Sequence, residues 1–127
     1  KDDGLIPSFI IKKEQVLFSI TPKDFSFIDE QNLHGIFELL AKEQIKINLM
    51  QNSALSFSIL VDAKKVDIFG LLSLLKNNFD VRYNDELELV TIRHYNTETI
   101  ESICAGKTVI IEQKTRFTAR FVLKVAN

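Results

Sequence analysis

The fold is decided by residues 45–62, which read IKINLMQNSALSFSILVD. Apolar residues alternate with polar ones over 45–50 and again over 55–61. Alternation with a period of two is typical of a half-buried β-strand. Polar residues dominate 51–54, between the two runs, and predict a tight turn, so the two strands should pair as a hairpin.

Upstream of this hairpin the sequence predicts a strand followed by a helix. Residues 16–21 alternate as a strand, which Pro22 ends. The loop 23–32 is rich in helix-capping residues, with Ser26 and Asp29 at capping-box spacing. After this loop, apolar residues recur at helical spacing and predict one buried helix face: Leu33, Ile36, Phe37, Leu40 and Ala41.

Downstream of the hairpin a second helix and a fourth strand are expected. Asp67 can cap a helix whose apolar residues recur over 68–75, and Val81 and Tyr83 start the next strand. The resulting order is β-α-β-β-α-β. This α+β order predicts a ferredoxin-like fold, a four-stranded antiparallel sheet with two helices on one face.

The remaining residues repeat only part of this plan. We predict strands at 87–94, 108–114 and 117–125 and one short helix at 97–105. The chain should therefore divide into a first domain over 14–85 and a shortened second unit over 86–127. Because a half-built sheet leaves open edges, the second unit is expected to be completed by the 5–13 segment or by another chain.

Composition excludes several classes of protein. Lys and Arg total 16 against 17 for Asp and Glu, a balance that disfavours nucleic acids and anionic membranes as partners. A single cysteine, Cys104, excludes a disulfide framework within the chain and fits a reducing compartment. The longest apolar stretch, 68–75, is far shorter than a membrane span of about 20 residues. Since the sequence starts at Lys1, we expect a fragment of a longer cytoplasmic protein.

The sequence offers no catalytic constellation. No glycine-rich phosphate loop occurs, and neither His34 nor His94 has partners at metal-ligand spacing. Cys104 has no neighbouring histidine that could activate it. The acidic residues Asp85, Glu86 and Glu88 could hold a metal, but a solvated turn explains them as well. We therefore expect no enzyme activity, no metal and no cofactor in this fragment.

The polar turn is the most informative segment. Asn48, Gln51, Asn52 and Ser53 crowd into six positions between two apolar strands. Amides and hydroxyls both donate and accept hydrogen bonds, so they suit a zwitterion such as an amino acid. Alternatively, these side chains only satisfy the backbone of a tight hairpin, as asparagine often does.

The stretch 45–62 resembles the first ACT domain of aspartate kinases. The family pattern there is (V/I)-x-(L/M)-(I/M)-x-x-S-x-x-S-(V/I/F)-S. The preceding HGIFELLAKEQIKIN is similar to the family's helix, and the earlier PSFIIKKEQVLFSI to its junction with the kinase domain. Further on, ELELVTIRH resembles the first strand of a second ACT domain. The resemblance covers nearly the whole chain, while the kinase domain, with its ATP and Mg sites, would precede Lys1.

The resemblance implies an allosteric site for an amino-acid effector. Lysine or threonine, end products of the pathway, would be sensed where ACT domains of two chains lie side by side, so a homodimer is expected. Backbone groups of the loop after the first strand would hold the effector carboxylate, and the second strand and turn would face its ammonium and side chain. The residues implied are Asp24, Phe25, Ser26, Phe27, Ile28, Ile47, Asn48, Asn52 and Ser53.

The chain departs from the family pattern in ways that keep other functions open. Lysine-sensing members often carry an acidic residue where Asn48 stands, and the second unit lacks a main helix because ICAGK runs straight into TVIIEQKTR. The alternative is a degenerate ACT pair that serves only as a structural dimerisation module. A third interpretation is a ferredoxin-like interaction domain from another enzyme.

Overall fold

The computed structural model describes residues 6–24 and 26–125. Its strands are hydrogen-bonded in the order β2-β3-β1-β4-β6-β5. The chain divides into two compact units. Of the described residues, those within 14–85 make up the first unit, and residues 6–13 together with 86–125 make up the second unit.

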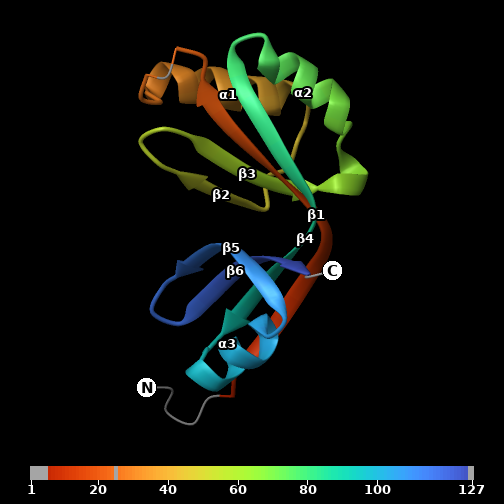
Figure 1. The fold of residues 1–127 in the computed structure, drawn as a ribbon, viewed down its shortest axis with the longest axis vertical. Helices are drawn as coiled ribbons and strands as arrows, with labels where there is room; N and C mark the ends of the chain where they lie inside the picture. The colour runs from red at the N-terminus through yellow and green to blue at the C-terminus, as the bar shows by residue number, and fades with distance from the viewer. Residues whose placement is uncertain (1–5, 25, 126–127) are drawn as a thin grey trace. The chain divides into compact units, whose positions relative to one another are not determined.

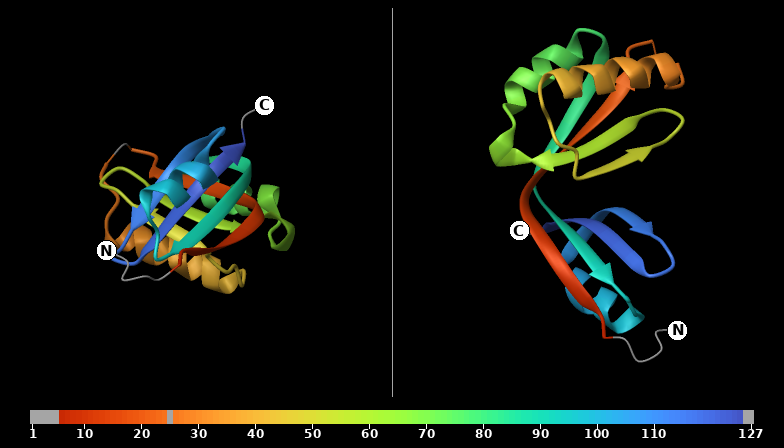
Figure 2. Two further views of the ribbon diagram at one scale, coloured as in Figure 1. Left: turned by 90° about the horizontal axis from the view of Figure 1, so that it is seen from below. Right: turned by 180° about the vertical axis from the view of Figure 1, so that it is seen from behind.

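The first unit has the predicted β-α-β-β-α-β order, with β2-β3-β1-β4 as its strand order. Helices α1 and α2 lie on the same face of this sheet (Figures 1 and 2). Its elements are β1 (Ser8–Pro22, from residue 14 on), α1 (Glu30–Lys42), β2 (Leu49–Asn52), β3 (Phe57–Asp62), a 3-10 turn (Ala63–Lys65), α2 (Ile68–Lys76) and β4 (Phe79–Arg93, up to residue 85).

The core of the first unit lies between the sheet and its two helices. Alternate residues of β1 and β3 pack against apolar residues of α1 and α2. Burying one such aliphatic or aromatic side chain stabilises the fold by about 1.5–3 kcal/mol. The buried members include Val16, Phe18, Ile20, Ile36, Leu40, Ile59, Val61, Leu71, Leu72 and Leu75.

The hairpin lies two residues further along the chain than predicted. Gln51 and Asn52, predicted as turn residues, belong to β2 and pair with Ser58 and Phe57. The Ser53 N–H donates to the Ser56 carbonyl over 2.9 Å, so the turn covers 53–56. The turn is displaced because Ser53 and Ser56 supply hydroxyls that close it.

The predicted start of the second strand at Ile45 is also corrected. Gln44 has φ of 57°, and the Ile45 N–H donates to the Leu40 carbonyl over 2.9 Å. The Gln44 N–H donates to Ala41 over 3.1 Å, which completes the hydrogen bonding of a Schellman motif at the end of α1. Ile45 therefore belongs to a helix cap and packs against the core, and β2 begins only at Leu49.

The capping box of α1 is formed by Asp29 and Asn32, not by the predicted pair of Ser26 and Asp29. Asp29 Oδ1 accepts from the Asn32 N–H over 2.9 Å, and Asn32 Oδ1 accepts from the Asp29 N–H over 3.0 Å. Because α1 begins at Glu30, Asp29 is the N-cap, and Ser26 lies too far upstream to share in it.

Within the part of the chain that the structure describes, the second unit has one helix, in agreement with the short predicted one. Its strand order is β1-β4-β6-β5, and α3 (Thr97–Cys104) packs on one face of that sheet (Figure 2). The other elements are β5 (Lys107–Lys114) and β6 (Thr118–Val125). Its core consists of Val90, Ile92, Ala119, Phe121 and Leu123, with Ile100 and Ile103 of α3 against it.

Two pairs of strands predicted as separate are continuous. Residues 8–13 of the segment 5–13, predicted to complete the second unit, form one strand, β1, with the predicted strand 16–21. Residue 5 of that segment lies outside the described residues. The strand predicted to start at Val81 and the strand 87–94 form β4. Each passes from one unit to the other at a residue with positive φ, Glu14 at 57° and Glu86 at 58°.

Candidate functional site

The predicted binding residues form two groups at opposite ends of the β2–β3 hairpin. Asn52 pairs with Phe57 beside the turn, whereas Leu49, which follows Asn48, pairs with Leu60 at the other end. Strands rise about 3.3 Å per residue, so Asn48 and Ser53 of one chain lie on the order of 15 Å apart.

The first group joins the hairpin turn to the loop after β1. The Ile28 N–H donates to the Ala54 carbonyl over 2.9 Å, which brings the end of the loop to the turn. Within the turn, the Ser53 hydroxyl lies 3.2 Å from the Ser56 hydroxyl and accepts from the Ser56 N–H over 3.2 Å. The Ser53 hydroxyl therefore already stabilises the turn.

The loop carries a negative charge close to the backbone groups that were predicted to bind the effector carboxylate. Asp24 Oδ1 accepts from the Ser26 N–H over 3.0 Å. Hydrogen bonds from Ser26, through its side chain and then its backbone, hold the pKa of the Asp24 carboxyl below its usual range. An effector carboxylate would therefore compete with Asp24 for the Ser26 N–H. Phe27 is 71% exposed, and Phe25 lies outside the described residues.

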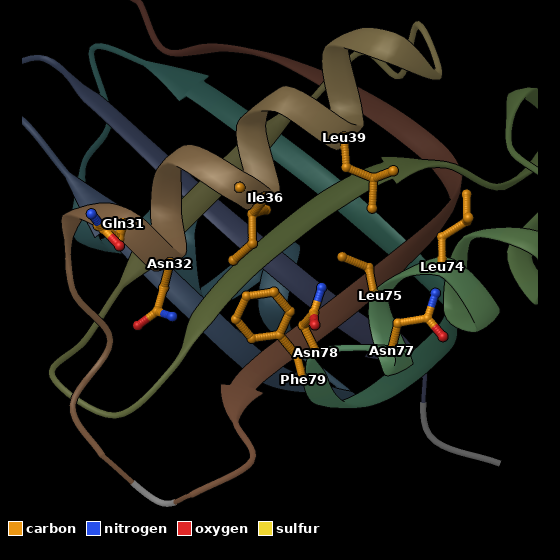
Figure 3. A pocket seen from close by; sticks show the side chains of 10 residues that line it. Gln31, Asn32, Ile36, Leu39, Leu74, Leu75, Asn77, Asn78 and Phe79 are labelled. Carbon is orange, nitrogen blue, oxygen red and sulfur yellow. The ribbon is translucent and has the colours of Figure 1, made fainter.

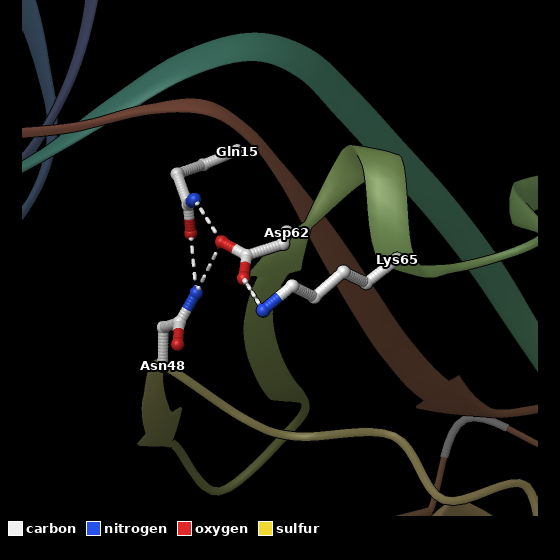
Figure 4. Close-up of polar contacts among 4 residues, drawn as sticks. All are labelled: Gln15, Asn48, Asp62 and Lys65. Atoms are coloured by element: carbon white, nitrogen blue, oxygen red, sulfur yellow. Dashed lines mark hydrogen bonds and ion pairs between the residues drawn. The ribbon is translucent and has the colours of Figure 1, made fainter.

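The second group is a polar cluster around Asn48 (Figure 4). Asn48 Nδ2 donates to Gln15 Oε1 over 2.8 Å and to Asp62 Oδ1 over 3.0 Å. Gln15 Nε2 donates to the same Asp62 oxygen over 2.6 Å, and Lys65 Nζ lies 3.8 Å from Asp62 Oδ2. Asn48 thus lies next to the carboxylate of Asp62, although Asn48 itself carries no charge.

Sequence reasoning missed Gln15 and Asp62 as members of this cluster. Each stands at one end of an apolar run, where a polar residue is unremarkable. They become neighbours only through the antiparallel register of β1 and β3, which pairs Gln15 with Asp62. Ile47, also predicted to face the effector, is half-buried and packs against the core of the first unit.

A groove of about 540 Å³ lies between α1 and the end of α2 (Figure 3). Its walls combine carboxamides with apolar side chains, and none of the predicted binding residues lines it. Gly35 lies on its α1 wall, and a Cβ added there would have no heavy atom within 4 Å. The residues around it are Gln31, Asn32, Gly35, Ile36, Leu39, Leu74, Leu75, Asn77, Asn78 and Phe79.

The other titratable candidates have ordinary structural partners. His34 lies 3.8 Å from Glu38 on the exposed face of α1. Glu88, from the acidic stretch, pairs with Lys107 over 2.9 Å. Burial raises the pKa of the Cys104 thiol, Glu112 raises it further and Lys107 opposes the shift, so this thiol is a weak nucleophile at neutral pH.

Neither a metal-binding cluster nor a membrane-spanning helix is present among the described residues. In the ranges 6–24 and 26–125, no group of three or more His, Cys, Asp or Glu side chains is placed to hold a metal ion. Among the helices of the same ranges, none combines the length and the apolar character needed to cross a membrane.

The chain has an ACT-type ferredoxin-like fold, and solved structures of aspartate kinases contain the same fold. The chain is similar to a C-terminal regulatory domain assigned to aspartate kinase of Porphyromonas gingivalis, with a TM-score of 0.77 and 15% identity over 94% of this chain and 86% of that one. It is also similar to aspartate kinase of Clostridium acetobutylicum, with a TM-score of 0.78 and 14% identity over 95% of this chain.

A further similar structure contains an amino acid that the resemblance implies. It is Escherichia coli aspartokinase III in complex with lysine and aspartate, with a TM-score of 0.71 and 15% identity over 92% of this chain. The chain spans 31% of the Clostridium kinase and 29% of the Escherichia coli kinase. No family model matches the sequence, and no curated protein matches it. At these identities the likeness establishes the fold alone.

Proposed function

We propose that this chain is the regulatory region of an aspartate kinase and binds an amino-acid effector between two copies of its first unit. The shared fold and the resemblance of residues 45–62 to the first ACT domain support this proposal. The parent protein would be a cytoplasmic ATP-dependent phosphotransferase acting on L-aspartate. Its ATP and Mg would bind in the kinase domain.

The observation that carries the proposal is the position of β2 at the edge of the sheet. β2 pairs with β3 alone in the strand order, and its residues from Met50 to Asn52 are exposed. An open edge is a template for a second strand, and twofold pairing of identical strands is antiparallel. A twofold axis between Met50 and Gln51 would set Asn48 of one copy opposite Ser53 of the other.

This dimer would unite the two groups of residues that a single chain keeps apart. The polar cluster of one copy would meet the turn and the loop 24–28 of the other. Asn52 and Ser53 would then contact the effector main chain, and loop backbone N–H groups would hold its carboxylate. The effector would shift the attached kinase between states by its difference in affinity for them.

The test is isothermal titration of this chain with L-lysine, L-threonine and L-methionine, alongside the variant Asn52→Ala. We expect saturable binding of one of them to the unmodified chain and at least a tenfold loss of affinity in Asn52→Ala, about 1.4 kcal/mol. The matched control is Gln31→Ala, which removes an exposed amide on α1 and should leave affinity unchanged. If the unmodified chain and both variants bind with equal affinity, the hairpin turn is not part of the binding site.

A second candidate function is structural dimerisation without sensing. The Ser53 hydroxyl is already hydrogen-bonded within its own turn, and the second unit has a single helix, both of which favour this alternative. It predicts a stable dimer that gives flat titrations and a melting temperature that does not respond to these amino acids.

A further inference from the structure

The first unit has a second open edge, formed by the first half of β4. In the strand order β4 lies between β1 and β6, but β6 pairs only with residues 87–93 of β4. Among the described residues, no strand therefore pairs with the outer edge of residues 79–85. The backbone N–H and C=O groups on such an edge can pair with a strand of another chain.

Charged and apolar residues alternate along this edge. Phe79 and Val81 belong to the core of the first unit, whereas Asp80 and Arg82 are exposed on the other face of the strand. Within the described part of the chain, neither of these two charged side chains forms an ion pair or a hydrogen bond. Two opposite charges thus lie on the same face of the edge strand, on either side of Val81.

This arrangement makes the edge complementary to itself. If a second copy pairs antiparallel about a twofold axis at Val81, Asp80 of each copy stands directly opposite Arg82 of the other. Side chains that are opposite in an antiparallel pair have Cβ atoms about 4.5–5.5 Å apart, close enough for an ion pair. Moving the axis to Asp80 or to Arg82 would set two like charges opposite each other, so the charges select the register at Val81.

An exposed aromatic pair lies beside the same edge. Phe69 of α2 is 70% exposed and Tyr83 of β4 is 41% exposed, and their rings meet edge to face with centroids 6.3 Å apart. In the register at Val81, Tyr83 of one copy stands opposite Phe79 of the other. Pairing would therefore remove apolar surface from water in addition to joining the charges.

We propose that residues 79–83 of β4 are a self-association surface, to which a second copy of this chain adds its own β4 with Asp80 opposite Arg82. This surface is distinct from the β2 edge and does not rest on effector binding. Because β2 and β4 are the two outer strands of the first unit, pairing through both would join dimers into larger assemblies.

The experiment is charge reversal, measured by sedimentation equilibrium on a chain that also carries Met50→Lys to block the β2 edge. No effector is proposed to lie across β4, so this association should require higher protein concentrations than the β2 dimer. We expect Asp80→Arg and Arg82→Asp each to raise the dissociation constant about tenfold, because both ion pairs become pairs of like charge.

The two reversals should compensate each other if the residues face each other across the edge. A chain with both Asp80→Arg and Arg82→Asp should associate as tightly as the Met50→Lys chain, and a mixture of the two single variants should form heterodimers. The control Glu38→Arg makes the same change of net charge as Asp80→Arg on the exposed face of α1, and it should leave the dissociation constant unchanged. Asp80 and Arg82 are exposed, so these variants should fold, and circular dichroism checks this.

The outcomes are decisive in both directions. Loss of association in each single reversal and its recovery in the double reversal would support pairing at Val81. Failure of the Met50→Lys chain to associate at any concentration would overturn the proposal, as would single reversals without effect or a double reversal without recovery. Neither result alters the titrations that test effector binding, so the two proposals stand or fall separately.

Discussion

At the scale of single residues, Glu14 and Glu86 stand out because each adopts a left-handed backbone conformation inside a strand. Their φ angles are 57° and 58°, and each lies where its strand passes from one unit to the other. For a residue with a Cβ this conformation costs about 1–2 kcal/mol. The two residues therefore mark the points at which β1 and β4 depart from regular strand geometry.

This strain reverses the usual difference in stability between alanine and glycine at position 86. In an ordinary strand glycine is less stable than alanine by about 0.5–1 kcal/mol, but glycine adopts positive φ without steric cost. We expect Glu86→Gly to be more stable than Glu86→Ala by up to about 1 kcal/mol, measured by urea denaturation. At the exposed control position Asp80 on the same strand, alanine should be the more stable. If alanine were the more stable residue at both positions, the proposed strain at Glu86 would be contradicted.

At the scale of elements, α1 depends on its capping box. Asp29 satisfies the Asn32 N–H, and Asn32 in return satisfies the Asp29 N–H. These bonds hold the start of α1 directly after the loop 24–28, which is part of the proposed site. The helix cap thus sets the residue at which α1 begins.

Removing this cap should destabilise the first unit without altering its core. We expect Asp29→Ala to lower the free energy of unfolding by about 1 kcal/mol, because the Asn32 N–H loses its acceptor. Asp29→Asn is the matched control, since asparagine caps helices about as well as aspartate. Urea denaturation monitored by circular dichroism measures both, and a loss of equal size in Asp29→Asn would assign the effect to charge instead of capping.

At the scale of the whole molecule, the proposed dimer depends on the β2 edge. Met50 is 51% exposed on β2 and lies next to the proposed twofold axis. A lysine on an edge strand opposes pairing with another strand, and a twofold axis would bring two such lysines together.

We therefore expect Met50→Lys to shift the protein from dimer to monomer, with an increase of tenfold or more in the dimer dissociation constant. Sedimentation equilibrium measures this constant directly. Met50→Leu, which keeps an apolar side chain of similar volume, should remain dimeric. A dimer of unchanged stability in Met50→Lys would show that the copies associate through another surface.

The class of fold and the order of elements in the first unit could be predicted from local sequence patterns. Local patterns were sufficient for this, because the alternation around Ile59 and the helical spacing from Leu33 to Leu40 each report which face is buried. Boundaries were less accurate where a local hydrogen bond prevailed over the pattern, as at the helix cap of Gln44 and Ile45 and at the turn closed by Ser53.

The grouping of the candidate binding residues, in contrast, could not be predicted without the pairing of the strands. Gln15 meets Asp62 through the pairing of β1 with β3, and Asn48 joins them because its N–H donates to the Leu60 carbonyl of β3. Asn48 and Ser53, in contrast, are close in sequence and lie at opposite ends of β2. This is because an extended strand separates residues that are close in sequence, while strand pairing joins residues that are distant in sequence. The sequence around Asn48 therefore indicated a polar site, whereas the register of the sheet places the Asp62 carboxylate beside it.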